Sequence, residues 1–216
     1  MRIAEWIKSL LFPPKCVLCK NILENGEIDL CKPCRCDNPV YKRKSSRPQF
    51  LDSFTAVWYY EEKVRSGLLR YKFGRYRSYA QSYGRLLAMV LLEEYPEGFD
   101  YLTWIPVSRR RRLQRGFDQV ELIAYAVGRE LQVKPVPLLK KIRHNRPQSG
   151  LRDSAHRRAN VLGAYKVLTP EMVSGKRIVL LDDILTTGAT ASECARVLKT
   201  AGAKEVHCAA MAAVRK

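Results

Sequence analysis

The stretch "RIVLLDDILTTGAT", residues 177–190, decides the fold, because four aliphatic residues run directly into two adjacent carboxylates. Ile178 to Leu181 predict a buried strand of a parallel sheet, which places Asp182 and Asp183 at its C-terminal end. Ligands of open α/β sheets bind in the crevice beyond the carboxyl ends of the strands. The stretch therefore predicts two carboxylates that face a ligand crevice.

The loop after the aspartates predicts a site for one phosphate group. Thr190 and Glu193 have the spacing of a capping box, so we expect the next helix to begin at Thr190. Backbone N–H groups of residues 186–190 would then gather at a helix N-terminus, where anions bind, and Gly188 lets the backbone approach closely. Because two carboxylates repel a phosphate, we expect the pair to hold ribose hydroxyls, with Mg²⁺ balancing the charge. The alternative is a polar strand end followed by an ordinary capped helix.

Further apolar segments predict that this strand has parallel neighbours. Residues 54–60 ("FTAVWYY"), 101–107 ("YLTWIPV") and 205–214 ("EVHCAAMAAV") are typical of strands, and stretches with helical spacing lie between them. Strands that alternate with helices indicate an α/β fold with a parallel sheet. A chain of 216 residues with 46% hydrophobic composition suits one such domain with a small attachment.

Five cysteines near the N-terminus predict the attachment. Cys16 and Cys19 form one closely spaced pair, Cys31 and Cys34 form a second, and Cys36 is left over. Each pair can direct two thiolates at one tetrahedral ion, so the spacing predicts a zinc ribbon in which the metal substitutes for a hydrophobic core. Two alternatives stay open at this point: a pair of disulfides, which a reducing cytosol disfavours, and Cys36 in place of Cys34 as the fourth ligand.

The remaining N-terminal segments set the expected domain limits. Residues 1–12 are amphipathic but interrupted by charges and too short to span a bilayer, so we expect a docking helix in a cytoplasmic protein without stable membrane insertion. Residues 41–53 are basic at their start, contain Ser and Pro and lack an apolar period, which is typical of a linker. We therefore expect a helix and zinc ribbon in residues 1–40, a basic linker in 41–53 and the α/β domain in 54–216.

The charge of the chain favours polyanionic partners. Lys and Arg number 39 against 21 Asp and Glu, which gives a net charge of +18. Cations stand beside aromatic residues in 70–83 and form a run in 108–115, a combination that suits single-stranded DNA. The alternatives are a solvated basic face and aromatic side chains that belong to the core. We predict that phosphates are neutralised by Lys72, Arg75, Arg77, Arg110, Arg111 and Arg112, and that bases stack on Tyr71, Phe73 or Tyr76.

Several motifs resemble those of one protein family. The stretch from Ile178 to Thr190 resembles the phosphoribosyl pyrophosphate (PRPP) binding motif of type I phosphoribosyltransferases. The segments "LLFPPKCVLC", "YKFG", "IPVSRRRRLQRGFDQVELIA" and "RPQSGLRDSAHRRANVLGAY" resemble, in the same order, the pattern of the ComF family of competence-associated proteins. The resemblance covers nearly the whole chain. It implies a zinc ribbon joined to a type I phosphoribosyltransferase fold, PRPP with Mg²⁺ as ligand, and a role in the uptake of transforming single-stranded DNA.

The resemblance also implies roles for individual residues. It implies that Asp182 and Asp183 bind the ribose hydroxyls. Ser108 and Arg109 fall where the pyrophosphate loop lies, after a strand that we expect to end at Val107. Residues 143–158 correspond to a mobile loop that closes over substrate; we expect Arg146 and Gln148 to contact ligand, and we count Arg146 with the two aspartates as catalytic. The resemblance implies that the 5′-phosphate is bound by Thr186, Thr187, Gly188, Ala189 and Thr190.

One residue departs from the family's pattern. Asp118 stands where we would expect Asn, and its position three residues before Glu121 predicts a helix N-cap with a purely structural role.

The parts of a transferase are present, but no segment is recognisable as an acceptor site. Three functions are compatible with the sequence. The chain is a DNA-uptake factor that binds single-stranded DNA and uses PRPP structurally or as a regulator, a transferase acting on an unknown base or amine, or an adaptor whose ribbon docks a helicase-like competence ATPase. We favour the first interpretation with the third included.

Overall fold

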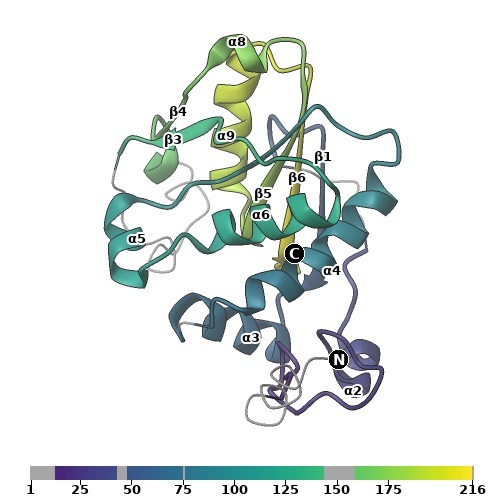
Figure 1. Cartoon of the computed structure of the whole chain (residues 1–216). Helices are drawn as coiled ribbons and strands as arrows, with labels where there is room; N and C mark the ends of the chain where they lie inside the picture. The colour runs from purple at the N-terminus through teal and green to yellow at the C-terminus, as the bar shows by residue number, and fades with distance from the viewer. Residues whose placement is uncertain (1–12, 43–47, 75, 144–158, 216) are drawn as a thin grey trace.

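The computed structural model describes residues 13–42, 48–74, 76–143 and 159–215, and its fold is built around one parallel sheet (Figure 1). All three pairs of neighbouring strands are parallel, so the predicted α/β sheet is confirmed. The strands lie in the order β1-β6-β5-β2. Their bounds are β1 (Ser53–Tyr59), β2 (Tyr101–Trp104), β5 (Arg177–Leu185) and β6 (Glu205–Ala213).

Strand β5 extends further than its neighbour β2. The register between them ends at the pair of Trp104 and Leu181, followed by one more hydrogen bond from the N–H of Ile105 to the Leu181 carbonyl (2.9 Å). Pro106 has no N–H, so the ladder stops there, and the prediction of a strand reaching Val107 is wrong. β5 continues past this point by pairing with β6, which leaves the end of β5 open on the β2 side.

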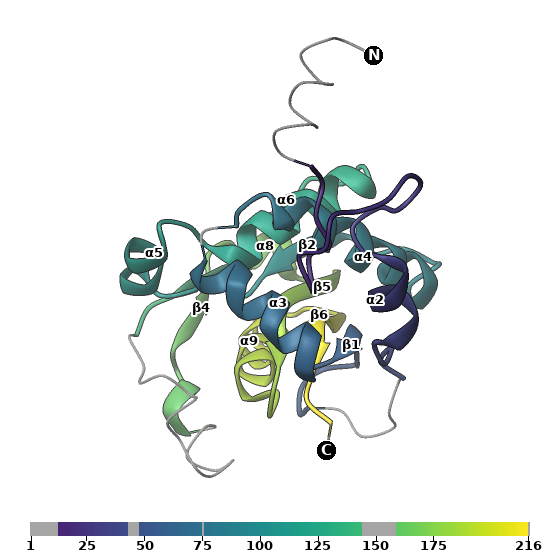
Figure 2. The same ribbon diagram turned by 90° about the horizontal axis from the view of Figure 1, so that it is seen from below.

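Helices cover both faces of the sheet (Figures 1 and 2). α4 (Tyr79–Glu94) and α6 (Gln119–Glu130) pack against each other and against one face, α4 on β1 and β6 and α6 on β2 and β5. α9 (Ala189–Thr200) packs on β5 and β6 from the other face and contacts β4. Beside it lie the antiparallel pair β3 (Leu139–Lys141) and β4 (Tyr165–Val167) and the short helix α8 (Pro170–Val173).

Two further helices border the carboxyl edge of the sheet. α3 (Glu62–Phe73) follows β1, and α5 (Arg109–Arg115) follows β2. The segment after α3 is tied to the end of α5, because Arg77 donates a hydrogen bond to the Gly116 carbonyl (2.8 Å) and its guanidinium lies 5.0 Å from the ring centre of Phe117. α3 and α5 therefore frame the same opening above the sheet.

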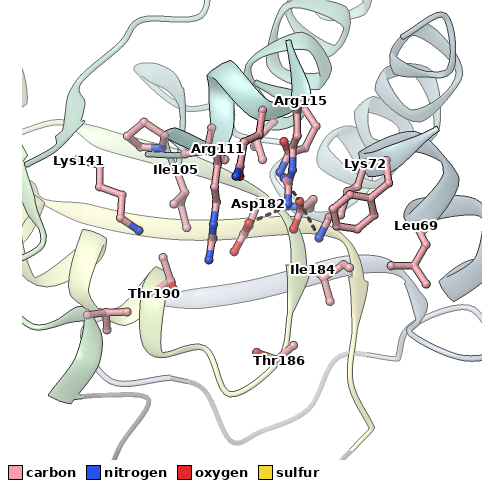
Figure 3. Close-up of a pocket in the computed structure, with 18 of the residues that line it drawn as sticks. Leu69, Lys72, Ile105, Arg111, Arg115, Lys141, Asp182, Ile184, Thr186 and Thr190 are labelled. Carbon is pink, nitrogen blue, oxygen red and sulfur yellow. Dashed lines mark hydrogen bonds and ion pairs between the residues drawn. The ribbon is translucent and has the colours of Figure 1, made fainter. Parts of the chain in front are cut away.

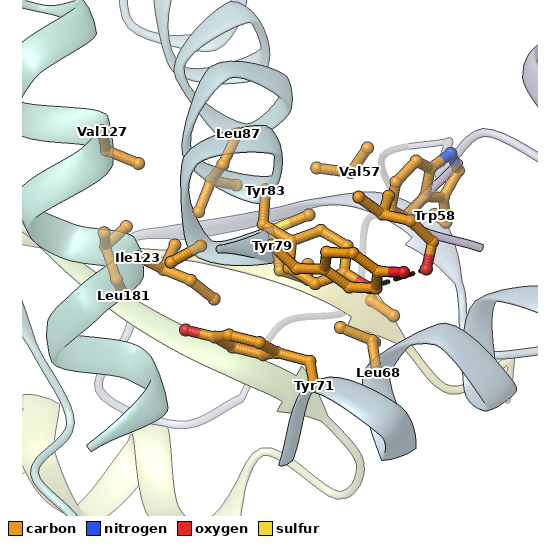
Figure 4. Close-up of a cluster of buried hydrophobic side chains, with 14 of the residues drawn as sticks. Val57, Trp58, Leu68, Tyr71, Tyr79, Tyr83, Leu87, Ile123, Val127 and Leu181 are labelled. Carbon is orange, nitrogen blue, oxygen red and sulfur yellow. Dashed lines mark hydrogen bonds between the residues drawn. The ribbon is translucent and has the colours of Figure 1, made fainter. Parts of the chain in front are cut away.

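The core between α3, α4, α6 and the sheet contains Tyr71, which we predicted from the sequence to stack on DNA bases (Figure 4). Tyr71 is fully buried, donates its hydroxyl to the Gln119 carbonyl (2.7 Å) and packs edge-on against Tyr83, with ring centres 5.3 Å apart. Leu68 and Leu181 belong to the same cluster. The prediction that Tyr71 stacks on bases is therefore wrong, because helical spacing turned this ring into the core.

The N-terminal attachment packs on α3 and α4. The Val17 carbonyl accepts a hydrogen bond from the Tyr83 hydroxyl (3.4 Å), and the Leu18 carbonyl accepts one from the Arg70 guanidinium. A Cβ atom at Gly67 would lie 2.8 Å from the Val17 carbonyl oxygen, so the absence of a side chain there allows the close approach. The attachment is thus in direct contact with the helix that borders the carboxyl edge of the sheet.

The predicted linker packs on the domain wherever it is described. The N–H of Tyr59 donates to the Pro39 carbonyl (3.1 Å) and the N–H of Tyr41 to the Val57 carbonyl (3.2 Å), so residues 39–41 pair with the edge of β1. Leu51 is buried in the core on the α9 side. The basic residues 43–47 lie outside the described residues, and the boundaries at 40 and 53 stay predictions.

The predicted docking helix, residues 1–12, also lies outside the described residues. Within the described ranges, no helix combines the length and the apolar character needed to cross a bilayer.

Candidate functional site

A cavity of about 710 Å³ lies where β5 extends past β2 (Figure 3). The end of β5 forms its floor, and its walls come from α3, α5, the first turn of α6, the β3–β4 pair and the start of α9. A volume of this size is typical of small-molecule sites. The charged and hydroxyl side chains that line it include Lys72, Arg111, Arg115, Lys141, Asp182, Asp183, Thr186 and Thr190.

Asp182 and Asp183 both line this cavity, but they have different neighbours, because successive side chains of a strand point to opposite faces. The Oδ2 atom of Asp183 accepts a hydrogen bond from Gln119 Nε2 (2.9 Å) and forms an ion pair with Lys72 Nζ (2.9 Å). Asp182 accepts a hydrogen bond through Oδ1 from the N–H of Asp183 (2.8 Å). Asp183 is therefore held from α3 and α6, whereas Asp182 is held by the backbone of its own strand.

These surroundings drive the acidities of the two carboxyls apart. Burial, and then the neighbouring Asp183, raise the pKa of Asp182 well above its usual range. Burial acts on Asp183 as well, but the Lys72 ammonium and the hydrogen bond from Gln119 outweigh it and lower the pKa of Asp183. Asp183 is therefore the stronger acid of the pair.

Cationic side chains from α5 and β3 line the cavity on the β2 side (Figure 3). Arg111 and Arg115 come from α5, and Lys141 from the end of β3. Lys141 Nζ donates a hydrogen bond to the Tyr165 hydroxyl (3.1 Å) and lies 4.9 Å from the centre of that ring. Burial, and then the charge of Arg111, lower the pKa of Lys141 to about 8. An anion in the cavity would favour the protonated form of Lys141.

The loop between β5 and α9 brings backbone and hydroxyl donors to the cavity. Thr186 and Thr190 line it, and the Oγ1 atom of Thr187 accepts a hydrogen bond from the N–H of Ala189 (3.4 Å). Gly188 adopts the left-handed conformation, with φ of 75°. A Cβ atom there would collide with Cγ of Pro48, so both the backbone angle and the packing require glycine.

The predicted capping box at the start of α9 is wrong. The helix begins at Ala189, one residue before Thr190, and its N-cap residue is Gly188. Glu193 instead accepts a hydrogen bond from the N–H of Gly163 (2.8 Å) and pairs with Arg196 (2.8 Å), because the β3–β4 side of the domain packs close to this turn. The expected helix N-terminus at the phosphate loop is nevertheless present.

Ser108 and Arg109, the predicted pyrophosphate ligands, do not line the cavity. Ser108 is buried as the N-cap of α5 and accepts a hydrogen bond from the N–H of Arg111 (3.4 Å), and Arg109 is exposed. The reason is that the segment forms a helix. Arg111 and Arg115 are four residues apart and share one helical face, which is the face that borders the cavity.

The residues predicted to bind DNA are divided between the cavity and the surface. Lys72 and Arg111 line the cavity, so the structure does not place them in an exposed strip. Arg77, Arg110 and Arg112 are exposed; Arg112 also lies 3.3 Å from Glu121. Arg75, together with Arg146 and Gln148 of the predicted mobile loop, lies outside the described residues.

Two aromatic residues of the predicted DNA surface are exposed. Phe73 is 65% exposed at the rim of the cavity, with the Arg115 guanidinium 4.9 Å from its ring centre. Tyr76 is partly exposed and stacks on Tyr79, with ring centres 5.1 Å apart. A cation and an exposed ring therefore stand together at the mouth of the cavity.

Asp118 has the structural role that the sequence predicted. Its carboxylate caps α6 by accepting hydrogen bonds from the N–H groups of Val120 (3.0 Å) and Glu121 (3.2 Å), and it also accepts from the N–H of Val107 (3.0 Å). These contacts fix Gln119 at the first position of α6, from which it reaches Asp183.

The four paired cysteines converge on a second candidate site. The Sγ atoms of Cys16, Cys19, Cys31 and Cys34 all lie within 4.8 Å of one another, and those of Cys19 and Cys31 are 3.5 Å apart. Four sulfurs around one zinc ion at bond lengths of about 2.3 Å would be about 3.8 Å apart, so the group could hold a tetrahedral metal ion. Cys36 is exposed and lies outside this group, which favours Cys34 as the fourth ligand.

Sequence reasoning missed several residues that line the cavity, among them Arg115, Gln119 and Lys141. Arg115 had a signal, since it stands one helical turn after Arg111 in a run that could have been read as a helix. No signal in the sequence marked Gln119 or Lys141, because a lone polar residue at a helix start or strand end belongs to no periodic pattern. Their roles depend on the way separate elements meet.

Comparisons with known proteins agree with this geometry. The family described as "Phosphoribosyl transferase domain" matches residues 121–216, which include both aspartates and the loop that follows them. Competence protein F of Haemophilus influenzae is 24% identical over 165 residues, covering 72% of this chain and 70% of that protein. DNA utilization protein YhgH of Escherichia coli O157:H7 is 27% identical over 221 residues, covering 92% and 96%. Competence protein ComFC of Streptococcus pneumoniae is 28% identical over 225 residues, covering 89% and 96%.

One solved structure is similar over part of its length. The glutamine PRPP amidotransferase of B. subtilis, solved with ADP and GMP, is 20% identical with a TM-score of 0.44. The match covers 67% of this chain and 30% of that chain, so our chain spans less than a third of that enzyme.

The fold is a parallel sheet flanked by helices, as in type I phosphoribosyltransferases, and residues 121–216 match the phosphoribosyl transferase domain family. Over most of its length the chain is similar to the competence and DNA utilization proteins, and four cysteines cluster near its N-terminus.

Proposed function

We propose that this protein binds PRPP with Mg²⁺ in the cavity and acts in the uptake or use of single-stranded DNA in the cytoplasm. The observation that carries the PRPP assignment is the meeting of two aspartates, two threonines and four cations in one cavity at the carboxyl edge of the sheet. The names of the relatives, competence protein and DNA utilization protein, support the biological role.

Each part of PRPP has a complementary group in the cavity. The ribose hydroxyls would donate to Asp182 and Asp183, and the 5′-phosphate would accept from Thr186, Thr190 and the N-terminus of α9. The diphosphate would face Arg111, Arg115 and Lys141, and these cations would stabilise its departure if an acceptor attacked the ribose carbon. Mg²⁺, when bound, would neutralise further diphosphate charge.

The PRPP assignment is tested by ligand-induced stabilisation. PRPP with Mg²⁺ should raise the melting temperature of the wild-type protein, because a ligand that binds only the native state stabilises it. The double variant Asp182→Asn/Asp183→Asn should lose most of that shift, since hydroxyl binding by two carboxylates is weakened by at least about tenfold when neither is ionised. Glu171→Gln, an exposed acid in α8, serves as the matched control. A folded double variant with an undiminished shift would place the ligand elsewhere.

The alternative function is transfer of the phosphoribosyl group to an unknown base or amine. The arginines and the lysine around the cavity favour it, since they are suited to stabilise departing diphosphate. Pyrophosphate released from PRPP only when a particular base, amine or DNA strand is added would identify the acceptor. If a protein that binds PRPP releases none with any of these, the bound PRPP acts as a structural or regulatory ligand.

We further propose that the cysteine cluster holds one structural Zn²⁺. The support is the convergence of the four Sγ atoms within 4.8 Å, with three of the four cysteines buried. No feature of the described residues indicates that this ribbon docks a helicase-like ATPase, so that partner stays a prediction.

Single-stranded DNA binding is proposed for the exposed surface of α5 and the segment after α3. Arg77, Arg110 and Arg112 are exposed there and could contact phosphates, while Phe73, at the cavity rim, could stack on an unpaired base. Lys72 and Arg111 are no longer assigned to DNA, because both line the cavity.

A further inference from the structure

We propose that Lys72 is a built-in counter-ion of the cavity, which neutralises Asp183 so that an anionic pentose phosphate binds beside the two aspartates at low Mg²⁺ concentration. This inference rests on the proposed binding of PRPP, which the aspartates and the threonine loop support without reference to Lys72. It names a residue that positions the ligand and sets its dependence on metal.

Lys72 contacts Asp183 directly. Lys72 Nζ lies 2.9 Å from Asp183 Oδ2, and the two side chains are only 15% and 10% exposed. Within the described part of the chain, Lys72 is the one cation in an ion pair with either aspartate, although Arg111 and Arg115 line the same cavity. In a site so shielded from water, the attraction between the two charges is less screened than at a surface, and loss of one partner leaves the other charge buried and unpaired.

The core beneath Lys72 fixes its position. Its neighbour Tyr71 is fully buried, and the Tyr71 hydroxyl bonds the Gln119 carbonyl (2.7 Å), which ties α3 to the start of α6. Gln119 in turn donates to the same oxygen of Asp183 that Lys72 contacts. The lysine is therefore pre-organised, and less side-chain entropy is lost when a ligand binds than with a mobile surface lysine.

The ion pair of Lys72 and Asp183 leaves hydrogen-bond donors and an acceptor oxygen available to a ligand. The ammonium has three N–H donors, and Asp183 is the only described partner of Lys72. Asp183 uses Oδ2 for both protein partners, and its Oδ1 accepts no hydrogen bond from the described residues. Gln119 Oε1 is buried and also has no partner among the described residues. A ligand hydroxyl could donate to Asp183 while a ligand oxygen accepts from Lys72, whereas Gln119 Oε1 is shielded by the protein.

The consequence concerns Mg²⁺. Two carboxylates beside a phosphate need positive charge, and that charge comes either from a divalent ion or from the protein. Because Lys72 supplies one unit of positive charge beside Asp183, removing it transfers that part of the requirement to Mg²⁺. The ratio of the PRPP Kd in EDTA to the Kd in saturating Mg²⁺ measures this dependence.

The experiment determines that ratio by calorimetric titration of PRPP into the full-length protein. In Lys72→Met the ratio should rise about tenfold above the wild-type ratio, the change expected when one partly buried opposite charge is lost. Lys72→Arg should stay near wild type. Lys63→Met, in the first turn of the same helix and 46% exposed, is the matched control and should leave the ratio unchanged.

Lys72→Met leaves Asp183 without its cation and could therefore misfold, so a second variant keeps the test possible. Lys72→Gln removes the charge but keeps a hydrogen-bond donor for Asp183, and its ratio should rise in the same way. A folded Lys72→Met or Lys72→Gln variant with the wild-type ratio overturns the role of Lys72. A wild-type protein that binds no PRPP with or without Mg²⁺ overturns the proposed function instead, so the two failures are distinguishable.

Discussion

The cysteine cluster and the cavity are assembled in opposite ways. All four thiols of the cluster come from one short segment, Cys16 to Cys34, whereas the cavity draws its lining from residues as far apart as Tyr60 and Thr190. A site built from a short segment is visible in the spacing of its residues. A site built from several elements becomes visible only where those elements meet.

The two regions also differ in what stabilises them. The cluster has few apolar residues of its own, so a bound metal would supply much of its stability. The cavity lies between two apolar cores, one on each face of the sheet. Helix α3 joins the regions, since Gly67 and Arg70 contact the attachment and Lys72 contacts Asp183. Four changes test how separate the two regions are.

Removal of one thiol should have the largest effect. Purified protein should contain about one zinc per chain, and Cys16→Ser should lose it and unfold the attachment, because metal binding supplies its folding free energy, on the order of 10 kcal/mol. Elemental analysis and thermal unfolding provide the measurements. Cys36→Ser, outside the cluster and exposed, should keep the metal. Equal zinc loss in both variants would contradict the assignment of ligands.

A methyl group at Gly188 should have the next largest effect, this time on the cavity. Gly188→Ala forces a Cβ into the left-handed region and against Pro48, which should cost roughly 2–3 kcal/mol in the free energy of unfolding. Gly163→Ala is the matched control, since Gly163 has φ of 68° but no atom within 4 Å of the added Cβ, and it should cost about 1 kcal/mol. Urea unfolding that shows the same cost for both would mean that the Pro48 contact contributes nothing.

The pH dependence of PRPP binding tests the cationic side of the cavity. The pKa of Lys141 is lowered to about 8, so the free protein loses this charge as the pH rises through that value. An anion that needs the protonated form should therefore bind about tenfold more weakly at pH 9 than at pH 7. Lys141→Arg keeps its charge and should make the profile less steep, and the remaining slope comes from Asp182, whose pKa is also raised. Lys140→Arg, exposed on the same strand, should leave the profile unchanged. A wild-type profile that is flat over this range would exclude Lys141 from the anion site.

Substitutions on the outer face of α5 should have the smallest effect. Arg110→Ala/Arg112→Ala should weaken binding of a labelled single-stranded oligonucleotide severalfold and reduce its salt slope by about 1.4, since each phosphate contact on a single strand contributes about 0.7. Arg111→Ala, which alters the cavity, should instead weaken PRPP binding. If the wild-type protein binds no oligonucleotide at moderate salt, with or without PRPP, the DNA proposal fails.

Much of the fold followed from the sequence. The aliphatic run before Asp182 predicted the buried strand β5, other β-rich segments predicted its parallel neighbours, and the cysteine spacing predicted the cluster. The glycine at position 188 and the N-cap at Asp118 were also predicted, because local backbone geometry and local hydrogen bonds determine both. These features are local, so neighbouring residues decide them.

The side chains that face the cavity were decided by the tertiary structure. The residues of the basic run do not show whether it forms a loop or a helix. Because it forms helix α5, Arg111 and Arg115 face the cavity and Ser108 is the N-cap residue. Tyr71 and Lys72 are adjacent in the chain, yet one lies in the core and the other reaches Asp183 across a gap of more than a hundred residues. The sequence determined that two carboxylates would stand at the end of a strand. The packing of α3 and α6 over that strand determined which of them is the stronger acid, because burial and the distance to a cation shift the pKa of each.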